Sequence, residues 1–197
     1  MTAAQTAITP GPPILLSRDI RQLPAGELGG GEASRSARDL GLTRYRLLAA
    51  HVRALPYGRN SARDDRLVLA EGRGTCSTKH ALLARVAAEN ALPVKLVLGI
   101  YWMTAASNPP VRSVLEDAGL AGIPEAHCYL SVANKRIDLT AEGEPRPLRL
   151  FCEEFINPKG IHSYKAERHQ AFIREWMGDD GSFEAIWTAR EACIAAL

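Results

Sequence analysis

The spacing of apolar residues predicts a helix in the first third of the chain. Between residues 43 and 55, Leu48, Val52 and Leu55 recur at intervals of four and three, which is typical of one face of a helix. The helix is expected to end before Pro56, because the residue that precedes a proline disfavours helical backbone.

Further helices are predicted towards the middle of the chain. Residues 64–69 and the apolar run 81–88 favour helices. Asn108, which is followed by two prolines, is expected to cap another helix. This helix would run through Leu115 and stop at Gly119.

The two ends of the chain differ in predicted secondary structure. Two amphipathic helices are predicted in the C-terminal part, one stopped by Gly178 and one capped by Ser182. The N-terminal part contains several prolines and the run Gly29–Gly31, which favour loops. We therefore expect an irregular N-terminal segment, residues 1–40, that flanks a single domain, residues 41–197.

Alternating apolar residues predict strands between these helices. After Pro93, the alternation over residues 94–100 predicts a strand with one buried face. Two more strands are expected around residues 127 and 138, joined by a tight turn at Ala133-Asn134. Helices followed by an antiparallel sheet and then by helices predict the α+β class.

Composition narrows the function classes. The hydrophobic fraction of 46% and the charged fraction of 23% are those of a soluble globular protein. A net charge of +2, without a block of basic residues, gives no case for a nucleic-acid partner. No apolar run approaches the roughly 20 residues that span a bilayer, and the first residues do not resemble a signal peptide. The expectation is a cytoplasmic protein without a membrane partner; the oligomeric state is left open.

Cys76 differs from the other cysteines because it lies at the predicted start of a helix. Four cysteines without a C-x-x-C pair are expected to be free thiols: Cys76, Cys128, Cys152 and Cys193. Unpaired backbone N–H groups and the helix dipole favour a thiolate at such a position. Since the thiolate is the nucleophilic form, Cys76 is the candidate nucleophile.

His127 and Asp138 are the candidate partners of this thiol. Side chains alternate along strands, which places both residues on the polar face. With Ala133-Asn134 as the turn, His127 opposes Thr140, and Asp138 is its diagonal neighbour at roughly 7–8 Å between Cβ atoms. A shift of one residue would move Asp138 to the other face.

This order of residues predicts a catalytic triad. Cys76 would attack a carbonyl, His127 would stabilise the thiolate and protonate the leaving amine, and Asp138 would orient the imidazole. The backbone N–H of Cys76 is a candidate oxyanion donor. Tyr57 and Asn60 are candidates for the second donor, and the sequence does not choose between them.

Three sequence blocks resemble those of the transglutaminase-like superfamily, and its small bacterial members in particular: Gly72–Leu83, Ala126–Leu130 and Arg136–Thr140. The resemblance implies a papain-like α+β core in which a nucleophile-bearing helix packs on an antiparallel sheet, with extra N- and C-terminal helices. It also implies Cys76, His127 and Asp138 as the triad. It implies no cofactor, because the calcium sites and additional β-domains of the large animal enzymes have no counterpart in this chain.

The expected function is cysteine-dependent acyl transfer at an amide or peptide bond, through a thioester. Fold and triad do not distinguish an amidase or peptidase from a transglutaminase that uses an amine acceptor. A non-catalytic binding module on the same fold and an amide-forming biosynthetic enzyme are the alternatives.

A metal site is disfavoured. Cys76 and His80 are four residues apart on one helix, but His127 and Cys128 point to opposite faces of a strand and cannot converge on one ion.

Several other polar residues are candidates for substrate binding, and Lys79 is expected to be a solvated helix residue. The binding candidates are Glu125 and Tyr129 near the histidine, and His162, Tyr164 and Lys165 in a predicted loop.

Overall fold

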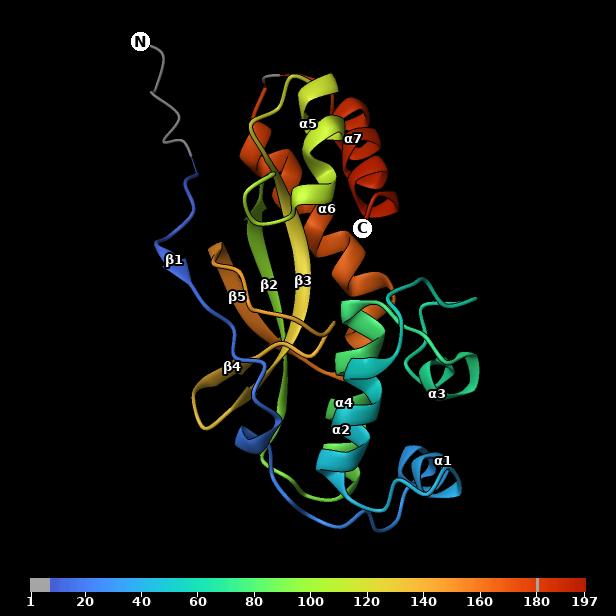
Figure 1. The fold of residues 1–197 in the computed structure, drawn as a ribbon. Helices are drawn as coiled ribbons and strands as arrows, with labels where there is room; N and C mark the ends of the chain where they lie inside the picture. Colours follow the sequence, from blue (N-terminus) through green and yellow to red (C-terminus); the bar gives the residue numbers. More distant parts are fainter. Residues whose placement is uncertain (1–7, 180) are drawn as a thin grey trace.

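One curled antiparallel sheet forms the centre of the molecule, and α-helices surround it (Figure 1). The computed structural model describes residues 8–179 and 181–197. The strands are β1 (Pro13–Ile14), β2 (Lys95–Met103), β3 (Ile123–Val132), β4 (Lys135–Ile137) and β5 (Leu148–Ile156). The α-helices are α1 (Glu32–Asp39), α2 (Tyr45–Ala54), α3 (Leu67–Glu71), α4 (Cys76–Glu89), α5 (Arg112–Asp117), α6 (Ser163–Met177) and α7 (Phe183–Ala195). Short 3₁₀ turns are η1 (Ile20–Gln22), η2 (Pro109–Val111) and η3 (Pro158–Ile161). The predicted α+β class is confirmed at this level.

The strand order across the sheet is β1-β5-β2-β3-β4. The long pair β2 and β3 runs in register from Lys95 opposite Ser131 to Met103 opposite Ile123. This pair is the scaffold for the histidine, because Gly99 of β2 lies directly opposite His127 of β3.

The hairpin between β3 and β4 has the predicted turn and register. Ala133 and Asn134 have φ values of 47° and 62°, the left-handed pair that a two-residue type I′ turn requires. Leu130 pairs with Ile137 across it, as expected. The ladder ends there, however, so Asp138 lies beyond the strand rather than within it. Its backbone N–H donates instead to the carbonyl of Ser17 at 2.8 Å.

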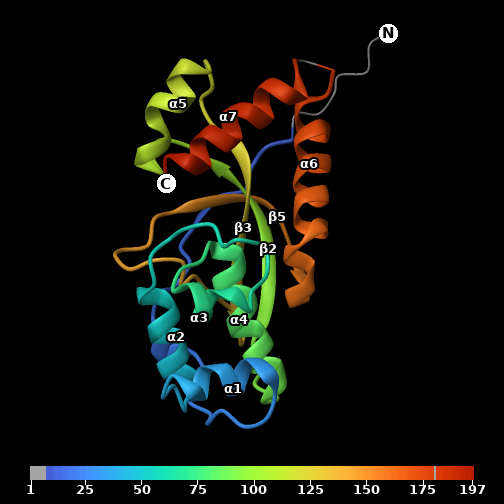
Figure 2. The same cartoon turned by 90° about the vertical axis from the view of Figure 1, so that its right-hand side faces the viewer.

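Helix α4 is the central helix of the core. It lies between β2 and β3 on one side and α1, α2 and α3 on the other (Figures 1 and 2). Its apolar side chains belong to the main hydrophobic core. Leu82, Leu83 and Val86 are almost completely buried. Helices α5 and α7 lie together at the end of the sheet nearest the start of α4, and α6 covers a separate side (Figure 2).

Helix α1 and strands β1 and β5 were not predicted. Helix α1 and strand β1 lie in the segment expected to be irregular, and β5 is an interior strand between β1 and β2. The helix expected to start at Asn108 is a 3₁₀ turn followed by α5, and the Asn108 side chain does not cap it; its Oδ1 accepts from Tyr101 at 3.1 Å. Residues 1–7 of the N-terminal segment lie outside the described residues. Among the described residues, no helix combines the length and the apolar character needed to cross a bilayer.

Candidate active site

Cys76 is the first residue of α4, as the sequence predicts. The turn before it is fixed by Thr78, whose hydroxyl accepts from the backbone N–H of Thr75 at 3.0 Å. The thiol is 8% exposed, so it is shielded from bulk water but can be reached from the cavities beside it. The free backbone N–H groups of the first helical turn surround a thiolate with positive potential.

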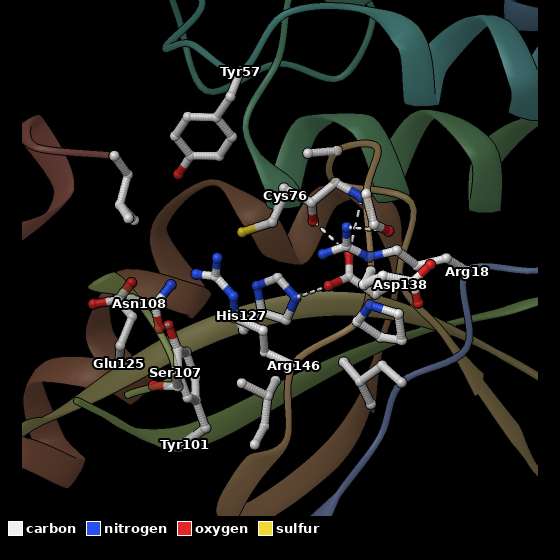
Figure 3. Close-up of a pocket in the computed structure, with 18 of the residues that line it drawn as sticks. Arg18, Tyr57, Cys76, Tyr101, Ser107, Asn108, Glu125, His127, Asp138 and Arg146 are labelled. Atoms are coloured by element: carbon white, nitrogen blue, oxygen red, sulfur yellow. Dashed lines mark hydrogen bonds and ion pairs between the residues drawn. The ribbon is translucent and has the colours of Figure 1, made fainter. Parts of the chain in front are cut away.

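The structure brings His127 and Asp138 into line with Cys76 (Figure 3). His127 Nε2 lies 3.0 Å from Asp138 Oδ2, and the opposite edge of the imidazole ring is turned towards the Cys76 sulfur. Asp138 is itself held by Thr140, whose backbone N–H and hydroxyl donate to Oδ1 at 2.9 and 2.5 Å. Asp138 thus orients the ring although it lies outside the ladder.

The rings of two tyrosines fix the His127 imidazole on its strand. Tyr101 and Tyr129 lie with their ring centroids 6.0 and 6.1 Å from that of His127. Rings at this separation pack in tilted or edge-on contact. Together with Asp138, they leave the imidazole one orientation.

The pKa of the Cys76 thiol differs from those of the other cysteines because of the charges around it. Burial alone would raise its pKa, but the cations of Lys165 and His127 lower the pKa of Cys76 to about 6. Burial raises the pKa of Cys128 to about 11, and it also raises the pKa of Cys152 and of Cys193. At neutral pH, Cys76 is the thiolate and the other three are thiols.

His127 carries the matching positive charge. Burial disfavours the imidazolium, but the negative charges of Asp138 and Cys76 raise the pKa of His127 to about 10. The pKa of Asp138 is held far below its usual range, against the effect of burial, chiefly by His127. The site therefore stores its proton on the imidazole.

His80 connects the nucleophile helix to the segment of Asp138. Its Nε2 accepts from the backbone N–H of Leu139 at 2.7 Å, so its Nδ1 carries the proton and donates to the Cys76 carbonyl at 2.8 Å. Burial lowers the pKa of His80 to about 4, which keeps it neutral. With both ring nitrogens occupied, His80 cannot serve as a metal ligand beside Cys76.

Lys79 is not a solvated residue, so that expectation is wrong. Its side chain is completely buried, and its Nζ donates to the carbonyls of Leu55 and Thr140, the latter at 2.7 Å. It ties α4 to the loop before the site and to the strand end after it. Burial lowers its pKa to about 8.

Two cavities meet at Cys76. The larger, of about 370 Å³, is lined by Tyr101, His127 and the loop at residues 140–146. The smaller, of about 260 Å³, is lined by the loop at residues 59–63 and by α6. Cys76 lines both cavities, together with Tyr57, Glu125 and Ile194. A substrate that spans the sulfur therefore has room on each side.

The two candidate oxyanion donors differ in availability. Tyr57 lines both cavities beside Cys76 (Figure 3), and its hydroxyl has no hydrogen-bond partner among residues 8–179 and 181–197. Burial raises its pKa, so it keeps its proton. Asn60 is already committed, because its amide donates to Glu71 at 3.1 Å and to the Arg73 carbonyl at 2.9 Å. Tyr57 therefore remains a candidate for the second oxyanion donor, whereas the Asn60 amide is already used in other hydrogen bonds.

The structure separates the predicted substrate-binding residues. Lys165 lines the smaller cavity and donates to Ser77 Oγ at 2.7 Å. Tyr129 is fully buried and donates to Glu153, so it supports His127 and does not line either cavity. His162 and Tyr164 are exposed and line neither cavity.

The segment of these last residues also differs from its prediction. It was expected to be a loop, but Tyr164 and Lys165 lie in the first turn of α6. Tyr164 points away from the site and donates to Glu154 at 2.7 Å.

Glu125 lines both cavities but is not free to bind an amine. It lies within β3, and Arg190 of α7 donates to its two oxygens at 2.6 Å each. Arg190 was missed from the sequence, because nothing local relates a helix near the C-terminus to this strand. Arg59 and Arg63, which lie beside Asn60 in the lining of the smaller cavity, were also missed, because nothing in the local sequence indicates that their side chains border a cavity.

Comparison with models of protein families, with curated proteins and with solved structures finds no match for this chain. The chemistry of the site is therefore argued from its own geometry.

Proposed function

We propose that this protein is a cysteine-dependent acyl-transfer enzyme that acts at an amide or peptide bond. The observation that carries the proposal is the line formed by Cys76, His127 and Asp138, with the sulfur at a helix start and the imidazole hydrogen-bonded at 3.0 Å to the carboxylate. The proposal includes a papain-like arrangement of the transglutaminase-like kind, in which a helix supplies the nucleophile and a sheet supplies its partners.

The charges on the site define the first half-reaction. The Cys76 thiolate attacks the carbonyl carbon, and the oxyanion that forms is stabilised by the Cys76 backbone N–H and the Tyr57 hydroxyl. The carbon–nitrogen bond then breaks, and the imidazolium of His127 gives its proton to the leaving amine. The products are a thioester on Cys76, a free amine and a neutral imidazole.

The second half-reaction restores the site. Water or an acceptor amine attacks the thioester while His127 takes its proton, and the sulfur leaves as a thiolate beside the new imidazolium. Hydrolysis, transamidation and amide formation share these residues, and the acceptor decides among them. No metal or cofactor takes part in these steps.

Acylation by 4-nitrophenyl acetate tests the proposal without knowledge of the natural substrate. After quenching in acid, mass spectrometry is expected to find one acetyl group on Cys76, and continued release of nitrophenol reports deacylation. The acylation rate should rise with pH around a midpoint of about 6, because the thiolate is the attacking form. Deacylation should instead slow on acidification, because His127 must be neutral to take the proton of the attacking water.

Cys76→Ala is expected to abolish both phases, and Cys152→Ala, which removes a half-buried thiol of raised pKa, should leave them unchanged. A non-catalytic binding module makes the opposite prediction. If Cys76 is acetylated no faster than Cys152, or with a midpoint near that of a free thiol, the proposed function fails.

A further inference from the structure

The smaller cavity beside Cys76 carries more positive than negative charge. Its lining contains four cationic side chains and one carboxylate, namely Arg59, Arg63, Lys165 and Arg190 against Glu125. The larger cavity has the opposite balance, since its lining contains two arginines against four carboxylates: Arg18 and Arg146 against Glu125, Asp138, Glu142 and Glu144. The two sides of the nucleophile therefore differ in the charge they favour.

Half of the positive charge in the smaller cavity is already neutralised by the protein. Arg190 binds Glu125 and also contacts Glu191 at 2.6 Å, and Arg59 contacts Glu191 at 2.7 Å. In this network the two arginines are balanced by the two glutamates. Among the described residues, Arg63 and Lys165 have no carboxylate within ion-pair distance.

The thiolate of Cys76 is the main negative charge acting on Lys165, ahead of Glu125. Its ammonium is half-buried, and burial opposes its charge, but the nearby anion of Cys76 raises the pKa of Lys165. Formation of a thioester removes that anion, because the acylated sulfur is neutral. The lysine would then be a partly desolvated cation that donates to the Ser77 hydroxyl and has only Glu125, which Arg190 already binds, as a nearby anion.

We propose that the substrate carries a carboxylate that binds in the smaller cavity between the ammonium of Lys165 and the guanidinium of Arg63. This inference rests on the proposed function, because it assigns the substrate of the same nucleophile. The bound carboxylate replaces the charge that the thiolate loses on acylation. Ser61 and Ser77, which line the same cavity, supply hydroxyl donors beside the two cations.

A pair of alkylating reagents that differ in one charge tests the assignment. N-chloroacetylglycine carries a carboxylate close to its reactive carbon, and N-chloroacetylglycinamide is its neutral analogue. The ratio of their rate constants at Cys76 is divided by the same ratio for N-acetylcysteinamide, a neutral free thiol. The expected value for the protein is about tenfold in favour of the anionic reagent, because the half-buried ammonium of Lys165 and the exposed guanidinium of Arg63 both attract it. High salt should reduce the preference.

Variants separate a specific carboxylate site from general attraction. Lys165→Met and Arg63→Ala are each expected to bring the normalised ratio towards one. Lys165→Met also changes the pKa of Cys76, but that change affects both reagents equally and cancels in the ratio. The matched controls Lys95→Met and Arg35→Ala, which replace exposed cations away from both cavities, should retain the preference.

The outcomes also distinguish this inference from the proposed function. If Cys76 reacts rapidly with both reagents and the normalised ratio is near one, or if the preference persists in both cavity variants, the carboxylate assignment is wrong and the nucleophile stands. If Cys76 reacts no faster than Cys152 with either reagent, the proposed function is wrong and the inference fails with it.

Discussion

His80 is a completely buried side chain that stays neutral, and both of its ring nitrogens are hydrogen-bonded. One ring nitrogen accepts from Leu139 and the other donates to the carbonyl of Cys76, so a second proton would break the hydrogen bond from Leu139. This arrangement fixes the distance between the start of α4 and the segment that carries Asp138. His80 is therefore a positioning residue for the line of catalytic candidates and touches no substrate.

Its titration predicts how stability depends on pH. Burial lowers the folded-state pKa of His80 to about 4, against about 6.5 in an unfolded chain. Between these values the unfolded chain binds a proton that the folded protein does not, so the free energy of unfolding rises with pH from about 4 to 6.5 and is lost on acidification. The contribution of this residue is at most about 3 kcal/mol.

Urea unfolding across this pH range measures the effect. His80→Gln is expected to be less stable at pH 7, and its unfolding free energy should depend less on pH between 4 and 6.5. The control His162→Gln, at an exposed position, should have the pH dependence of the unchanged protein. An equal slope in His80→Gln and the parent would show that His80 does not stay neutral on folding.

At the scale of elements, α1 depends on a residue of another helix. Its N-cap is Gly31, which has no side chain to cap it. Glu89, the last residue of α4, accepts from the backbone N–H groups of Ala33 and Ser34 at 3.0 and 2.8 Å, and from the Ser34 hydroxyl at 2.6 Å. A carboxylate at this place also complements the helix dipole.

Glu89→Ala is expected to lower the free energy of unfolding by about 1–2 kcal/mol, the usual cost of a lost N-cap. Amide hydrogen exchange should accelerate in residues 32–39 more than in α2. Acylation of Cys76 should be unaffected, because the two residues lie at opposite ends of α4. The exposed Glu167→Ala is the control for loss of charge alone, and slow exchange of α1 in Glu89→Ala would contradict this role.

The missed elements show what a sequence pattern can supply. The turn at Ala133-Asn134, the strand β2 and the start of α4 follow from local preferences and were predicted correctly. Helix α1 buries only small residues such as Ala33 and Ala37, and its cap comes from a residue far along the chain, so no local apolar pattern marks it. Strand β5 carries glutamates in adjacent positions on both faces, which obscures its alternation.

The parts of the site that depend on residues close together in the sequence were predicted, and those that depend on contacts between distant residues were missed. Strand alternation and the turn register placed His127 and Asp138 on one side. The final position of Asp138, however, depends on a backbone contact with Ser17, far away in the sequence. The prediction for Lys79 was wrong because its partners are backbone carbonyls, and the identities of the residues that carry them do not reveal such a contact.

At the scale of the whole molecule, the C-terminal helices complete a site that the central sheet and α4 begin. Helix α6 contributes Lys165 to the smaller cavity, and α7 contributes Arg190, which reaches Glu125 of β3. Burial opposes ionisation of Glu125, but His169 and Arg190 hold its pKa below the usual range. The pair therefore ties the end of the chain to the strand that bears His127.

The cost of this pair depends on whether one member or both are removed. Arg190→Met leaves a buried carboxylate without its cation, and the free energy of unfolding is expected to fall by about 3–5 kcal/mol. In Glu125→Gln/Arg190→Met both charges of the pair are removed, so the double variant should be more stable than Arg190→Met, although it has lost one more native side chain. Urea unfolding of both single variants and the double variant gives the coupling directly. Additive losses would mean that α7 is held by its apolar contacts with α5 and the sheet, with Arg190 and Glu125 acting independently.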